Sequence, residues 1–132
     1  EYNNLGLGIS HSNEGASMKT VNWREEFPAA ITVTDKDDII IEMNQKAADL
    51  FSKDGGKALI GKDLLDCHSH LSQEKIKKIQ AGKNPNIYTI QKNDIKKMVF
   101  QAPYFENGRY AGLVEISFEL PAEVPHFNRD MR

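Results

Sequence analysis

The feature that most restricts how this chain can fold is a pair of alternating segments within residues 97–120. In 109–120 (RYAGLVEISFEL), side chains alternate between two faces, which is the period of a β-strand, and 97–105 (KMVFQAPYF) alternates in the same way. Asn107-Gly108 lies between them, and this residue pair is strongly favoured in two-residue hairpin turns because both positions need a positive φ. The sequence therefore predicts a long antiparallel hairpin with one strongly apolar face.

The first part of the chain predicts a second hairpin. Residues 29–34 (AAITVT) alternate in β-branched side chains, and 39–43 (IIIEM) form another short apolar run. The polar residues 36–38 (KDD) between the two runs are typical of a turn. Residues 86–91 (NIYTIQ) predict a further strand ahead of the long hairpin.

Helices are expected between the two groups of strands. Asn44 is a natural N-cap for a helix over 45–51, and Ser72 for a helix that runs to about Ala81. Leu71 and Ile76 have the spacing of a hydrophobic staple at that second start. The order β-β-α-α-α-β-β-β predicts an α+β domain, in which an antiparallel sheet is covered by helices on one face.

Size and composition restrict the class of protein. The chain has 132 residues, a net charge of −2 and one cysteine. These values suit a single domain in a reducing, cytoplasmic compartment and give no electrostatic case for nucleic-acid binding. No apolar run has the length of a membrane span. We expect a flexible arm at 1–20, the folded domain at 21–121 and a tail at 122–132.

Three segments together resemble the PAS domain. They are ITVTDKDDIIIEMNQKAADLF, LIGKDL and GRYAGLVEISFEL, and the resemblance covers about residues 23–120. The residues that match the family's signature and its glycine after the middle helices are Asn44, Ala47, Ala48, Leu50, Phe51 and Gly61. The resemblance implies a PAS-like five-stranded antiparallel sheet with helices on one face, which commonly enclose a ligand cavity. It also implies a sensory or dimerisation module that is not an enzyme.

The segment DCHSH, at 66–70, holds the one cysteine and two of the four histidines. It is similar to small bacterial PAS proteins, as is the closing LPAEVPHFNRD. Cys67, His68 and His70, with His126, are possible zinc ligands, but structural zinc sites use paired ligands from separated segments. Because haem-binding PAS domains often take an axial histidine near this helix, His68 or His70 is also a haem candidate. The interpretation we favour is a loop that approaches the helix and holds no metal.

Catalysis and flavin photochemistry are not favoured. Cys67 and His68 are adjacent, which points their side chains apart in most backbone conformations, and no third group is evident to orient a base. The Asn-Cys-Arg-Phe-like motif of flavin photoreceptors is absent, because the cysteine lies in Asp-Cys-His-Ser.

We expect a cavity beneath the long helix. Gly112 and Ala102 are small residues on the face taken as inward, and small residues leave space for a ligand or for a helix. His68 is the polar group expected to meet a ligand. The residues predicted to contact the ligand are His68, Ile76, Ile79, Met98, Phe100, Val114 and Ile116. A ligand-free dimerisation or adaptor domain with a filled core is the alternative, and a haem sensor is a further one.

A homodimer is the expected assembly. Trp23 and Phe27 form an apolar turn before the first strand, and Val124 and Phe127 lie in the tail, so these side chains have no obvious place in a core of this size. Pro121 prevents the last strand from continuing as a signalling helix. If this chain is the whole protein, it must regulate an unidentified protein partner by direct contact.

Overall fold

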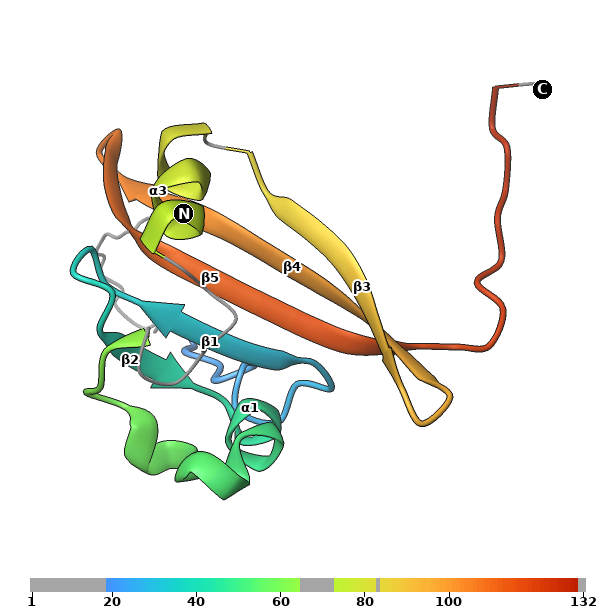
Figure 1. Cartoon of the computed structure of the whole chain (residues 1–132), viewed down its shortest axis with the longest axis horizontal. Helices are drawn as coiled ribbons and strands as arrows, with labels where there is room; N and C mark the ends of the chain where they lie inside the picture. The colour runs from blue at the N-terminus through green and yellow to red at the C-terminus, as the bar shows by residue number, and fades with distance from the viewer. Residues whose placement is uncertain (1–18, 65–72, 83, 131–132) are drawn as a thin grey trace.

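The computed structural model describes residues 19–64, 73–82 and 84–130, and the sheet at its centre has five strands in the order β2-β1-β5-β4-β3 (Figure 1). All neighbouring strands are antiparallel. The strands are β1 Ala30–Thr34, β2 Ile40–Met43, β3 Asn86–Lys92, β4 Ile95–Glu106 and β5 Arg109–Leu120. This arrangement confirms the predicted α+β fold, including the pairing of the first two strands.

The helices lie between β2 and β3 in the chain. They are α1 Gln45–Leu50, the 3₁₀ helices η1 Ser52–Asp54 and η2 Gly56–Leu59, and α3 Gln73–Gly82. In Figure 1, α1 lies beside β1 and β2, whereas α3 lies over the β4 and β5 end of the sheet. The buried cluster formed between these elements contains Ala30, Ile40, Met43, Ala47, Leu59, Leu64, Ile76, Ile79 and Leu113.

The turns of the β3-β4-β5 meander use residues with a positive φ. Asn107 and Gly108 have φ values of 53° and 79°, as the sequence predicted for this hairpin. Asn93 and Asp94, with φ values of 53° and 65°, make the turn between β3 and β4 in the same way. Asparagine and aspartate tolerate this conformation better than other non-glycine residues, so local sequence sets both turns.

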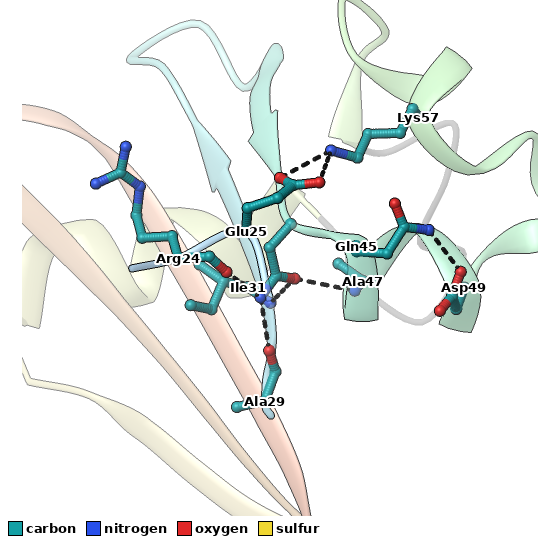
Figure 2. A network of polar contacts seen from close by, with 9 residues as sticks. Arg24, Glu25, Ala29, Ile31, Gln45, Ala47, Asp49 and Lys57 are labelled. Atoms are coloured by element: carbon teal, nitrogen blue, oxygen red, sulfur yellow. Dashed lines mark hydrogen bonds and ion pairs between the residues drawn. The ribbon is translucent and has the colours of Figure 1, made fainter. Parts of the chain in front are cut away.

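Asn44 fixes the start of α1 to the sheet. Its Oδ1 accepts hydrogen bonds from the backbone N–H of Ala47, at 3.0 Å, and of Ile31, at 2.9 Å. Its Nδ2 donates to the carbonyl oxygens of Arg24 and Ala29, at 2.9 and 2.8 Å. Figure 2 shows these partners gathered around one point. The predicted N-cap is therefore confirmed, and the same side chain also holds the segment before β1 in place.

The structure corrects the assignment of the sheet's faces. Tyr110 packs against the core, as expected. The pairing then shifts, because Phe105 pairs with Tyr110 and Tyr104 with Gly112, which leaves Ala111 as an extra residue in β5. This bulge moves the rest of β5 to the opposite face from the one that unbroken alternation predicts. Leu113, expected on the outer face, is buried in the core.

Three residues predicted to contact a ligand, Met98, Phe100 and Ile116, are on the outer face of the sheet. Phe100 pairs with Ile116 and Met98 with Phe118, and directly opposite residues of an antiparallel pair lie on the same side. Phe100 and Phe118 are 36% and 39% exposed, so neither belongs to the core.

Gly112 also has a different role from the one predicted. A Cβ on this residue would overlap the carbonyl oxygen of Thr34 and would lie 2.7 Å from a ring carbon of Tyr104. The hydroxyl of Tyr104 donates to that same carbonyl oxygen at 2.9 Å. The absent side chain therefore makes room for a close approach of backbone and ring, and it leaves no space for a ligand.

Candidate functional site

A small cavity lies between α3 and the sheet. Its volume is about 20 Å³, which is room for about one water molecule. It is lined by Thr32, Thr34, Leu64, Ile76, Ile79, Gln101, Leu113, Val114 and Glu115. Ile76 and Ile79, one helical turn apart on α3, are both buried and close the cavity on the helix side.

A row of polar residues crosses the sheet beneath this helix. Asn86 on β3 pairs with Gln101 on β4, Gln101 pairs with Glu115 on β5, and Glu115 pairs with Thr32 on β1. Side chains directly opposite one another across antiparallel strands have their Cβ atoms about 5 Å apart, so these four form a continuous polar row. Three of them, Thr32, Gln101 and Glu115, line the cavity.

Gln101 has a hydrogen-bond donor with no partner among the described residues. Its Oε1 accepts from the Nδ2 of Asn86 at 2.8 Å, so the oxygen branch of the amide is engaged. The residue is 4% exposed, and its Nε2 is buried without an acceptor in the described part of the chain. An unmatched buried donor costs roughly 1–3 kcal/mol, so this group needs an acceptor, which a small shift of the Glu115 carboxylate, a water in the cavity or a ligand can supply.

Glu115 brings a carboxyl group to the same place. Burial raises the pKa of this carboxyl, and hydrogen bonding from the side chain of Gln101, which lies close to it, opposes that shift with a smaller effect. No lysine or arginine is among the described residues that line the cavity, so the carboxylate has no cation there to compensate its burial.

Thr34 is held firmly at the edge of the cavity. Its Oγ1 accepts a hydrogen bond from the backbone N–H of Leu113 at 3.1 Å, and its carbonyl oxygen accepts from Tyr104. The hydroxyl proton of Thr34 is free to turn toward another acceptor, because a hydroxyl donates as well as accepts.

The structure brings together some of the residues that the sequence predicted for the pocket. Ile76 and Ile79 line the cavity with buried side chains. Val114 also borders it, although the bulge places its side chain on the same side of the sheet as that of Ile116. Met98, Phe100 and Ile116 do not line it. Ile116 is on the outer face because of the bulge in β5, and Met98 and Phe100 are there because Phe105, the residue of β4 opposite Tyr110, faces the core and alternation places them on the other side. His68 lies outside the described residues, so the role expected for it stays a prediction.

Sequence reasoning missed the polar row. Gln101 and Glu115 occupy positions that strand alternation assigned to solvent. The bulge reverses that assignment for Glu115, and Gln101, directly opposite it on β4, lies on the same inner face. A usable signal was present nevertheless. Thr32, Gln101 and Glu115 fall in the middle of their strands, where a pairing diagram places them side by side.

The predictions about metal ligands concern residues that the structure does not describe, namely Cys67, His68 and His70. Within the described ranges, no three His, Cys, Asp or Glu side chains gather in a way that would hold a metal ion. No helix in the described part of the chain is long and apolar enough to cross a membrane.

A family model described as the PAS fold matches residues 23–109, and the chain belongs to this family. Domains of the family are typically sensory, non-catalytic modules. No curated protein matches the sequence.

Solved structures with this fold include several bacterial sensory proteins. The PAS domain of BvgS from Bordetella pertussis has a TM-score of 0.58 at 17% identity, with 74% of this chain and 81% of that chain covered. A sensory box sensor histidine kinase from Vibrio cholerae has a TM-score of 0.56 at 12% identity, with 73% and 85% covered. The Aer2 receptor from Vibrio cholerae, a dual PAS-haem oxygen sensor, has a TM-score of 0.54 at 15% identity, with 70% and 95% covered. At these identities the likeness establishes the fold alone.

Proposed function

We propose that this chain is a sensory PAS domain that binds a small molecule in the cavity beneath α3 and regulates a partner protein by direct contact. The observation that carries this proposal is the buried Nε2 of Gln101, which has no acceptor in the described part of the chain and belongs to a residue that lines the cavity. A ligand acceptor would satisfy this donor.

The cavity is too small for most ligands unless the structure changes. Because 20 Å³ admits about one water, a larger ligand requires α3 to move away from the sheet. Ile76 and Ile79 are the described side chains that would withdraw. Such a movement of one helix would transmit a signal, because it changes the surface that a partner protein contacts.

Thermal-shift screening of a metabolite library tests this proposal when the wild type is compared with Ile79→Phe. The larger side chain fills the cavity, so stabilisation by a ligand should be lost in the variant. Leu50→Phe, an exposed position on α1, is the matched control and should keep the wild-type response. A ligand that stabilises Ile79→Phe as well as the wild type would place its binding elsewhere.

The second candidate is a ligand-free dimerisation or adaptor domain. The small volume of the cavity favours this candidate, because a filled core is what an adaptor needs. A library that stabilises neither the wild type nor the control variant would support it. A haem sensor is the further alternative, and it depends on His68 or His70; a Soret band in protein purified from cells supplied with haem would select it.

We also propose that two copies of the chain associate through the outer face of the sheet. On β3, β4 and β5 this face carries adjacent uncharged side chains, with Ile87 opposite Phe100 and Phe100 opposite Ile116. Ile87 is 53% exposed. Because this part of the face is apolar and uncharged, it is complementary to itself, which is what a two-fold interface requires.

The segment before β1 extends this surface. Arg24 forms an ion pair with Glu42 of β2 at 3.2 Å, and Glu25 pairs with Lys57 at 2.9 Å (Figure 2 shows the second pair). Trp23 and Phe27 pack edge to face with ring centroids 5.3 Å apart and are both exposed. Two exposed aromatic rings on an anchored segment are suitable contacts for a second copy.

A further inference from the structure

The ionisable side chain that lines the cavity determines which ligand charge the cavity can accept. Among the described residues that line it, Glu115 is the one with an ionisable side chain, and the others are aliphatic, hydroxyl or amide residues. An anion placed beside Glu115 would meet a like charge in a site with little water, where repulsion is strong. Carboxylate and phosphate ligands are therefore disfavoured.

The polar row also presents a donor and an acceptor in a fixed order. Because the Oε1 of Gln101 is engaged by Asn86, the NH₂ branch of the amide is the group left for a ligand. Glu115, directly opposite on β5, offers carboxyl oxygens about one side-chain spacing away. A ligand that satisfies both residues must accept from Gln101 and donate to Glu115.

An amide group has this arrangement. Its carbonyl oxygen accepts and its N–H donates, and the two atoms are separated by one carbon. A carboxylate lacks the donor and carries the disfavoured charge. An amidinium would be attracted by the charge of Glu115, but it has only N–H donors, so it would set a donor against the Nε2 of Gln101. The three groups have nearly the same shape, and hydrogen bonding and charge alone separate them.

We propose that the cavity recognises a small uncharged ligand through an amide-type group, a primary amide or a lactam, whose oxygen accepts from Gln101 and whose N–H donates to Glu115. This inference rests on the proposed function, because it requires that the cavity admits a ligand. It adds the chemical class of that ligand and the two residues that select it.

The test is an NMR titration of the full ¹⁵N-labelled chain with acetamide, acetate and acetamidinium at equal millimolar concentrations. Acetamide should shift the backbone amide signals of Thr32, Gln101 and Glu115, and acetate should bind at least tenfold more weakly. Gln101→Leu should weaken acetamide binding about tenfold, because it removes the donor. Glu115→Gln should admit acetate, because it removes the negative charge and adds a second donor.

Xenon is the probe that separates failure of this inference from failure of the proposed function, because it enters apolar cavities without hydrogen bonds. A shift of the cavity signals by xenon or by any of the three probes shows that the cavity admits a ligand. If acetate or acetamidinium then binds as well as acetamide, the amide inference is overturned and the cavity remains a ligand site. If neither xenon nor any probe produces a shift, both proposals are overturned. The comparison among probes in the wild type stands even if Gln101→Leu does not fold.

Discussion

The Oδ1 of Asn44 accepts a hydrogen bond from the backbone N–H of Ile31, 13 positions earlier in the chain, at 2.9 Å. The same oxygen caps α1 through Ala47, so one side chain joins the first strand to the first helix. This connection accounts for the match of Asn44 to the family signature better than helix capping alone, because a serine or aspartate would also cap the helix.

Asn44→Ala should lower the free energy of unfolding by about 3 kcal/mol, because it removes buried hydrogen bonds and leaves their backbone partners unmatched. Urea denaturation followed by circular dichroism measures this change. Gln45→Ala is the matched control on the next residue. It removes an exposed 2.8 Å bond to Asp49 (Figure 2) and should change stability by less than about 0.5 kcal/mol. Equal losses in both variants would mean that Asn44 does not join the strand to the helix.

Gly112→Ala should destabilise the domain by about 3 kcal/mol, because the added methyl group overlaps the Thr34 carbonyl oxygen and the Tyr104 ring. Gly108→Ala is the control, because it replaces a glycine of positive φ without causing a steric overlap. Gly108 has a positive φ of 79° but no atom within 4 Å of the added Cβ, and its substitution should cost about 1 kcal/mol. Thermal denaturation under the same conditions compares the stability of the two variants. A Gly112→Ala protein as stable as Gly108→Ala would contradict the close approach.

The raised pKa of Glu115 gives the stability of the fold a pH dependence. Burial makes the folded protein bind this proton more tightly than the unfolded chain does, so the folded state loses stability as pH rises from about 4.5 through the raised pKa. Glu115→Gln should remove this loss and should be more stable than the wild type at neutral pH.

Urea denaturation at pH 4.5 and at pH 8 measures the effect as the difference between Glu115→Gln and the wild type, which should be larger at pH 8. Glu119→Gln removes a charge from an exposed position on the same strand and controls for net charge. Its stability should stay within about 0.5 kcal/mol of the wild type. A Glu115→Gln protein that loses stability at pH 8 would show that the carboxylate has a favourable partner in the fold.

Phe118→Glu should shift the proposed dimer to a monomer, because it places a charge within the apolar outer face of the sheet. Phe118 is 39% exposed, so the domain itself should remain folded. Ile60→Glu, at a 41% exposed position after η2, is the control and should leave the assembly unchanged. Light scattering coupled to size-exclusion chromatography measures the molar mass of both variants. A wild type that is monomeric at high micromolar concentration rejects the dimer.

Local chemistry explains which parts of the fold the sequence predicts. The Asn107-Gly108 turn and the Asn44 cap depend on residues within a few positions of one another, and both are present in the structure. The face that β5 presents after Tyr110 depends instead on a distant contact. The bulge between Tyr110 and Gly112 occurs where Gly112 meets Thr34 from the first hairpin, which no local pattern reveals.

The residues of the candidate site likewise differ in whether local sequence predicts them. Ile76 and Ile79 follow from helical spacing, which is local, and they close the cavity. Gln101 and Glu115 were not predicted, because a polar residue in an alternating strand is normally assigned to solvent. Their burial becomes visible only once the strand pairing and the bulge are known.

Native mass spectrometry tests the central claim, that the cavity beneath α3 holds a small molecule, most directly. Wild-type protein and Ile79→Phe are incubated with the same metabolite extract and their intact masses are compared with the masses of the denatured chains. The account predicts a small mass increment on the wild type that is absent from Ile79→Phe. An increment of equal size and occupancy on both proteins, or no increment on the wild type, would contradict it.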